Sequence, residues 1–355
     1  MILKSSTPFP EFRKGIVHIR EDGVLVPDVK GIKESTRTFW RCVKQPPGVT
    51  RQMNKLVIFF LCCIPLAAGM LATSADRAWG ERIARYSFAA SPLHQFKTDL
   101  DQGGSYEMSG VFLHSSFTES VNENVDAGVA LRYACEEYRF ENPVFTGQAR
   151  PWSEVHTVQG AFFYVRTMDN GWRMRLSPSI RFSGESGAQT SDAVAWGGSL
   201  SFSRLMKPGL TLGAGIAYVD DIDKRSALPI VMVRWDITDR MTLGTAPGSG
   251  PAGPAGMELT YRIDDTWTMA TGTAWRSQKF RLDRHGFFSG GVARSRCLPV
   301  WVRASRSLTG NVSFDFYGGA MLAGSLRIDN ARGDRIADDD YASAFFLSCM
   351  LSARF

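Results

Sequence analysis

Arginine side chains recur at positions that alternate with apolar residues along several stretches of this 355-residue sequence. In the clearest stretch, from Trp172 to Phe182, Arg173, Arg175 and Arg181 alternate with large apolar side chains. A guanidinium group stays charged and carries five N–H donors, so several of them facing one space would attract and bind anions. The candidate residues for this chemistry are Arg132, Arg173, Arg175, Arg181, Arg234 and Arg276.

These arginines have two interpretations. Acidic residues such as Asp126 and Asp236 fall on the same predicted face, so ion pairs across neighbouring strands could neutralise the arginines. Arginines without such partners would instead line a space that prefers anions, as in anion-selective pores. The sequence leaves both interpretations open.

Two histidines lie close in sequence to serines near the ends of predicted loops. His156 is three residues after Ser153, and His285 is four residues before Ser289. A serine nucleophile needs a histidine base that a third group orients, and nothing in the sequence positions that third group. We therefore predict no catalytic residue, and a lipid-modifying barrel enzyme is the least favoured alternative.

Two further motifs suggest cofactors only weakly. The acidic segment 329–340 offers oxygen ligands for calcium, but its spacing differs from that of an EF-hand loop, so a solvated loop is the default interpretation. The G-x-G-x-x-G match at 248–253 contains and adjoins prolines, which prevent the helix that would bind a phosphate. We expect no metal and no cofactor.

The arginines belong to segments with a period of two, which indicates β-strands with two different faces. Segments of this kind recur from about residue 83 to the end, with strong contrast between an apolar and a polar face. Long strands that are apolar on one side and polar on the other are typical of a transmembrane β-barrel with a polar interior.

Short turn signals alternate with longer polar segments along this region. The turns rest on residues that tolerate positive φ or fix a turn, and they lie at 122–124, 169–171, 207–209, 238–240, 264–265 and 309–311. The longer loops are predicted at roughly 134–154, 183–193, 219–227, 246–256, 281–291 and 327–340. This alternation predicts an antiparallel up-and-down barrel of fourteen strands, the first near 85–99, with twelve as the fallback.

The last strand is predicted over Tyr341–Phe355, and its alternate residues are apolar back from the terminal Phe355. Three prolines, Pro178, Pro229 and Pro299, fall inside predicted strands. Because proline cannot donate to a ladder, we expect them at bulges or strand ends.

The front of the chain differs from the rest. Residues 1–75 contain 11 of the 41 Lys and Arg and 5 of the 35 Asp and Glu, so the rest of the chain contains 30 of each. The basic character therefore belongs to the front and is no evidence for nucleic-acid binding. Residues 53–75, with a basic start, an apolar run and small residues, predict a cleaved signal peptide. Residues 1–52 are interpreted as a non-structured extension, upstream of a true start at Met53, or as a tail on an uncleaved anchor.

The region from about Ile83 to Phe355 resembles a family of uncharacterised bacterial outer-membrane β-barrel proteins defined only by a domain of unknown function. The resemblance rests on the signal peptide, the segment Asp99-Leu-Asp-Gln-Gly-Gly104, the strands that begin on aromatic residues after short turns, and the terminal Arg354-Phe355. It implies an outer-membrane β-barrel over residues 76–355 and defines no catalytic residues.

The sequence thus predicts a barrel of the bacterial outer membrane. Its expected surroundings are outer-membrane lipid and lipopolysaccharide, and its last segment, Tyr341–Phe355, would engage the barrel assembly machinery. The leading functional hypothesis is a passive pore for small solutes with an anion preference. The alternative from another class is a non-conducting structural or assembly barrel that presents its loops to partners.

Overall fold

The computed structural model describes residues 17–19, 25–27, 84–245, 253 and 255–355. The first two of these ranges are three-residue strands, β1 (Val17–Ile19) and β2 (Leu25–Pro27), which pair with each other. The rest of the predicted extension, and the whole predicted signal peptide at 53–75, lie outside the described residues. Within the described ranges, no helix is both long and apolar enough to cross a membrane.

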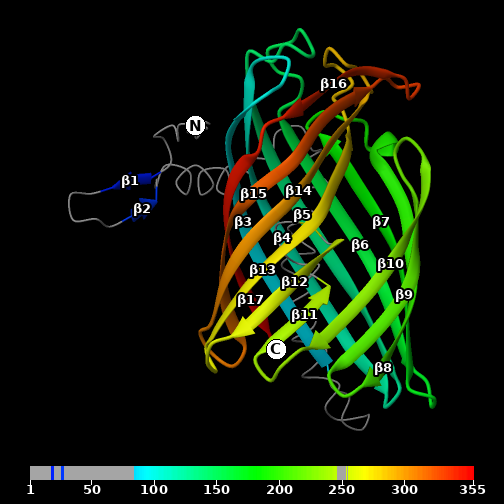
Figure 1. Cartoon of the computed structure of the whole chain (residues 1–355). Helices are drawn as coiled ribbons and strands as arrows, with labels where there is room; N and C mark the ends of the chain where they lie inside the picture. Colours follow the sequence, from blue (N-terminus) through cyan, green and yellow to red (C-terminus); the bar gives the residue numbers. More distant parts are fainter. Residues whose placement is uncertain (1–16, 20–24, 28–83, 246–252, 254) are drawn as a thin grey trace, which may run out of the picture.

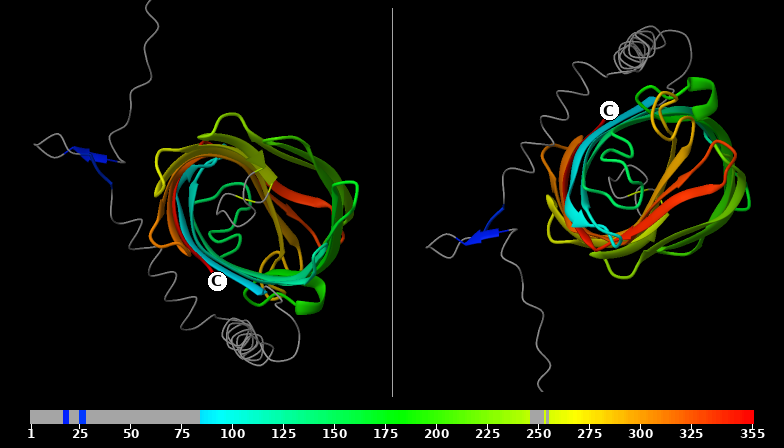
Figure 2. Two further views of the ribbon diagram at one scale, coloured as in Figure 1. Left: turned by 90° about the horizontal axis from the view of Figure 1, so that it is seen from below. Right: turned by 90° about the horizontal axis from the view of Figure 1, so that it is seen from above.

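The described body of the chain is a closed antiparallel barrel of fourteen strands (Figures 1 and 2). Each strand pairs with its neighbour in sequence, and β17 closes the ring on β3 over pairs from Phe346↔Gln95 to Arg354↔Ser87. The strands of the ring are β3 (Ala84–Asp99), β4 (Ser105–Asn122), β5 (Val125–Glu141), β6 (Glu154–Thr167), β7 (Trp172–Glu185), β8 (Val194–Lys207), β9 (Leu210–Asp220), β10 (Arg225–Asp236), β11 (Met241–Thr245), β12 (Ala255–Arg262), β13 (Trp267–Arg281), β14 (Val292–Ser307), β15 (Val312–Asp329) and β17 (Ala344–Arg354).

Tight turns join the strands at one end of the barrel, called the turn end below, and longer connections join them at the other, the loop end. The turns follow from their residues. Gly171 and Gly209 adopt φ of +80° and +77°, which a side chain would disfavour. Asp264 caps its turn by accepting hydrogen bonds from the backbone N–H groups of Thr266 and Trp267. The predicted turn positions, the strand number and the first strand near 85–99 are confirmed.

The two faces of the strands lie as the alternation predicts. On β17, Phe345 and Leu351 are 53% and 47% exposed on the outer surface, whereas Phe346 and Met350 are buried inside. On β7, Leu176 and Ile180 are likewise exposed. Because exposed apolar side chains recur around the outside of the ring, the outer surface suits contact with lipid rather than water.

Strand boundaries near the loop end differ most from the prediction in three places. Strand β5 continues to Glu141, so the connection predicted at 134–154 covers only 142–153. The loop predicted at 327–340 contains an extra strand, β16 (Arg335–Tyr341), which pairs with the loop-end part of β15. The predicted last strand is divided, because Tyr341 belongs to β16 and β17 begins at Ala344. Charged residues in these segments, such as Asp338-Asp339-Asp340, have low strand propensity and conceal the period of two.

The three prolines lie inside strands, where the hydrogen-bonded ladder is incomplete. Pro178 lies at a gap in the β6–β7 pairing, and Pro299 at a gap in the β13–β14 pairing beside a bulge. Pro229 lies in the part of β10 that precedes its pairing with β11, which begins at Arg234. The missing N–H donors therefore coincide with interruptions of the ladder, which is how a closed barrel accommodates proline.

Candidate functional site in the barrel lumen

The interior of the barrel is lined unevenly. A core of large buried side chains lies on β3 to β5, β13 to β15 and β17. On β9, by contrast, the residues that alternate with the exposed Leu212 and Ile216 are small, namely Thr211, Gly213, Gly215 and Ala217. The neighbouring strand β8 opposes them with Ser199, Ser201 and Ser203. The lumen is therefore filled on one side and lined by small residues on the other.

Four of the six predicted arginines pair with carboxylates. Arg173 lies 3.6 Å from Asp126, Arg181 lies 2.6 Å from Asp221, and Arg234 lies 3.6 Å from Asp236. Arg276 pairs with Glu136. For these four, the interpretation as ion-paired residues describes what the structure shows.

The Arg276–Glu136 pair crosses the interior of the barrel. Arg276 is on β13 and Glu136 is on β5, and these strands are not neighbours in the ring. The Gln278 side chain, also on β13, donates to the second oxygen of Glu136. Glu136 is 1% exposed, so both of its oxygens are engaged away from water.

The other two arginines have no carboxylate partner within the described ranges. Arg175 lies over the ring of Phe163, with its guanidinium carbon 4.8 Å from the ring centroid, a cation–π contact. Arg132 lies opposite His114 on β4 and opposite Gln159 on β6. Because a guanidinium without a carboxylate keeps its charge uncompensated, these two arginines mark places where an anion would be stabilised.

Arg132 belongs to a row of polar side chains that runs across four adjacent strands. The register pairs His114 with Arg132, Arg132 with Gln159, and Gln159 with Arg181. All four line one cavity of about 220 Å³, and Arg276 and Gln278 line it from β13. Sequence reasoning identified three of these residues, Arg132, Arg181 and Arg276, and the structure places them around one space.

A second interior network lies nearer the turn end. Arg303 on β14 pairs with Glu258 on β12 at 2.6 Å and with Asp315 on β15 at 3.0 Å. The Trp301 indole N–H also donates to Glu258. Both carboxylates are buried and share the one guanidinium of Arg303, so this network ties three strands of the wall together.

The connection between β5 and β6 folds into the lumen at the loop end, inside the ring of strands in Figure 2. Its Trp152 is 1% exposed and packs edge-on against Phe280 of β13, with ring centroids 5.7 Å apart. Tyr138 and Phe140 of β5 contact the same indole at 5.8 and 4.9 Å. Strand β13 also pairs with β7 at Arg281↔Gly184, although the two strands are not neighbours in the ring. The lumen is therefore narrower at the loop end.

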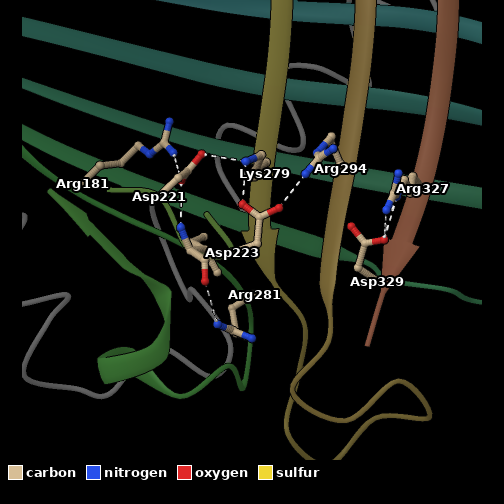
Figure 3. Close-up of polar contacts among 9 residues, drawn as sticks. Arg181, Asp221, Asp223, Lys279, Arg281, Arg294, Arg327 and Asp329 are labelled. Atoms are coloured by element: carbon tan, nitrogen blue, oxygen red, sulfur yellow. Dashed lines mark hydrogen bonds and ion pairs between the residues drawn. The ribbon is translucent and has the colours of Figure 1, made fainter. Parts of the chain in front are cut away.

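The β9–β10 connection is held to β13 and β14 by ion pairs, shown in Figure 3. Asp223 lies 2.6 Å from both Lys279 and Arg294, and Asp221 lies 3.2 Å from Lys279. Arg281 donates to the carbonyl of Ile222 in the same connection. Burial alone would raise the pKa of Asp223, but its hydrogen bond with Lys279 and the charges of Lys279 and Arg294 outweigh burial and hold that pKa below its usual range.

The residues weighed for catalysis do not assemble as a nucleophile and its base. The Ser153 hydroxyl donates to Glu185, and the Ser289 hydroxyl donates to the carbonyl of Arg284. His156 is buried and contacts Glu154, Tyr133 and the hydroxyl of Ser186, but not Ser153. In the acidic segment, Arg327 pairs with Asp329 and Arg335 with Asp338.

Glu154 and His156 form a group with Cys135 in which potential ligand atoms lie within 4.8 Å of one another. The Cys135 sulfur lies 3.6 Å from an oxygen of Glu154, and His156 lies 3.1 Å from the same oxygen, so these side chains are partners of one another. We assign no metal to this group.

Several interior residues could not be identified from the sequence. His114, Gln159, Glu136 and Asp223 acquire their roles from the strands or loops opposite them. Single polar residues of this kind are common in strands and carry no motif. The only available signal is their alternation with apolar residues, which assigns a face but not a partner.

Solved structures with a similar arrangement of strands are barrels of the outer-membrane type. They include an outer membrane channel from Pseudomonas putida F1, 9% identical, with a TM-score of 0.43 over 77% of this chain and 96% of that one. The P. putida toluene transporter TodX is 8% identical, with a TM-score of 0.39 over 77% and 90%. The translocator domain of the autotransporter NalP from Neisseria meningitidis is 10% identical, with a TM-score of 0.33 over 82% and 96%. At these values the similarities provide no basis for assigning a substrate.

No curated protein matches the sequence. A family model described as Domain of unknown function (DUF6268) matches residues 114–355. The matched region begins in β4 and includes every later strand of the barrel, which is more than half of the chain. The protein therefore belongs to the DUF6268 family.

Proposed function

We propose that this barrel is a passive pore for small solutes that favours anions. The observation that carries the proposal is the pair Arg132 and Arg175, which lie on the inner face without a carboxylate partner among the described residues. The other four candidate arginines each pair with an acid, which Arg173 shares with Arg85, and they add less to the net field. The preference would therefore depend on two side chains rather than six.

The lumen lining suits passage through one side of the barrel. The inner faces of β8 and β9 carry only small side chains over the residues described above, and β8 is the neighbour of β7, which carries Arg175. A fixed positive charge beside such a passage raises the local concentration of anions and lowers that of cations. This effect weakens as ionic strength rises, because mobile ions screen the charge.

The exposed apolar outer surface supports a location in the bacterial outer membrane, in contact with lipid and lipopolysaccharide. We propose that the turn end faces the periplasm, as short turns do in such barrels. The apolar outer residues of β17 support recognition of Tyr341–Phe355 by the assembly machinery. Export by the signal peptide at 53–75 is part of the same proposal.

Single-channel recording of the refolded barrel in a planar bilayer, under a salt gradient, tests the pore. We expect discrete conductance steps and a reversal potential that favours anions. The double variant Arg132→Gln/Arg175→Gln should keep the steps and lose most of the preference. A matched double variant, Arg234→Gln/Asp236→Asn, removes a neutral pair and should leave the preference unchanged.

The alternative of a non-conducting barrel is favoured by one specific observation, the filled loop end. Trp152 and Phe280 meet there from opposite sides of the lumen, and Asp223 ties a connection to two further strands. If protein shown to be folded gives no conductance steps, the pore is refuted and this alternative replaces it. If steps appear without ion preference, the pore stands and the role of the two arginines is refuted.

A further inference from the structure

The row His114, Arg132, Gln159 and Arg181 has unused hydrogen-bonding capacity. The Nδ1 atom of His114 and the Nε atom of Arg181 are buried and have no hydrogen-bond partner. The side chain of Arg132 lines this cavity and forms neither an ion pair nor a hydrogen bond with the described residues. Buried polar groups are nearly always satisfied, so unsatisfied groups gathered at one cavity call for a missing partner.

The missing partner must accept hydrogen bonds and carry negative charge. Guanidinium groups are donors only, and the amide of Gln159 and the ring of His114 can each donate a further bond. Side chains that face each other on neighbouring strands lie about 5 Å apart, so one oxyanion could contact two or three members of the row. The planar fork of Arg132 matches a carboxylate or a phosphate in particular.

The carboxylates near the cavity are already engaged. Glu136 lines it, but its two oxygens are bound by Arg276 and Gln278. Asp221 forms an ion pair with the Nη2 atom of Arg181 at 2.6 Å. The Nε atom of Arg181 has no partner and remains available to a ligand. Neither acid therefore neutralises Arg132, and the cavity retains an excess of positive charge.

We propose that this cavity is a saturable binding site for a small oxyanion, a solute that presents a carboxylate or a phosphate group. The proposal rests on the proposed function, because such a site would select among the anions that enter the lumen. At about 220 Å³ the cavity is smaller than drug-sized pockets of about 300–1,000 Å³, which limits the ligand to a compact solute.

Isothermal titration of the refolded full barrel in detergent tests the site, with succinate and inorganic phosphate as probes. We expect at least one of them to bind saturably, and the neutral solute glycerol not to bind. The Arg132→Gln variant should weaken binding at least tenfold, because a hydrogen bond from a charged group is lost. Arg132→Lys keeps the positive charge but loses the paired N–H donors of the guanidinium group, so it should also weaken binding. This second variant tests the site if Arg132→Gln does not fold.

Arg173→Gln is the matched control, because Arg173 is a candidate arginine outside the row that pairs with Asp126. It should keep the affinity within twofold. Saturable binding that Arg132→Gln and Arg132→Lys leave unchanged would overturn the proposal. Equal displacement by chloride would also overturn it, because charge screening alone would then explain the signal.

The outcomes separate this site from the pore. Anion-selective conductance without saturable binding would refute the site and leave the pore standing. Saturable binding in protein that shows no conductance would refute the pore and support the site.

Discussion

Replacement of Asp223 by asparagine should destabilise the barrel substantially. Asp223 lies 2.6 Å from both Lys279 and Arg294, and these side chains are only 10% and 6% exposed. Removing one member of a buried ion pair costs about 3–5 kcal/mol, because the other charge stays buried without a partner. Lys279 retains Asp221, but Arg294 has no second carboxylate in the described part of the chain, so we expect about 3 kcal/mol, near the lower bound.

The chain offers a matched control at the start of the same connection. Asp220 pairs with Arg225 at 3.2 Å, but these side chains are 44% and 74% exposed. An exposed pair is worth about 0–1 kcal/mol, so Asp220→Asn should have little effect. Equilibrium unfolding by guanidinium in lipid vesicles measures both variants through the shift of the midpoint. Equal shifts for the two variants would refute the conclusion that burial makes the Asp223 contacts strong.

Three further predictions follow from the loop end and the ladder. The pKa of Asp223 is lowered in the folded protein, so the stability that its ionised carboxylate contributes should be complete above the usual aspartate pKa of about 3.9 and be lost as the pH falls below it. Proteolysis of the β9–β10 connection should therefore speed up only below about pH 4. Trp152→Ala should cost about 3–5 kcal/mol in unfolding experiments and raise single-channel conductance; unchanged conductance would exclude a constriction there. Gly324→Ala should cost about 1–3 kcal/mol, since a Cβ would overlap the Tyr341 ring, whereas Gly310→Ala meets open space and should leave the midpoint unchanged.

Most of the barrel could be predicted because its strands follow a simple rule. Lipid outside and a polar interior impose a strict alternation, and the turn residues mark where each strand ends. The prediction was wrong in β16 and at the end of β5. In β16 charged residues lie on both faces, so the contrast between faces is absent. At the end of β5 the alternation is present but reversed, because apolar side chains such as Tyr138 are buried in the lumen and charged ones such as Arg139 are exposed.

The lumen site was predictable only as separate residues. The alternation identified Arg132 as a residue of the inner face, but a bulge between Ser120 and Asn122 shifts the register of β4 against β5. Counting back from the turn without this bulge pairs Arg132 with Ser115, whereas the structure pairs it with His114. A one-residue shift exchanges the two faces of a strand, so the partners of Arg132 could not be derived from the sequence.

The account depends most on passage of anions through the lumen, which solute flux into lipid vesicles measures directly. Vesicles that contain the refolded barrel should admit a small anion faster than a cation of similar size, and the difference should shrink at high salt and in Arg132→Gln/Arg175→Gln. No flux of either solute through protein shown to be folded, or faster flux of the cation, would contradict the account.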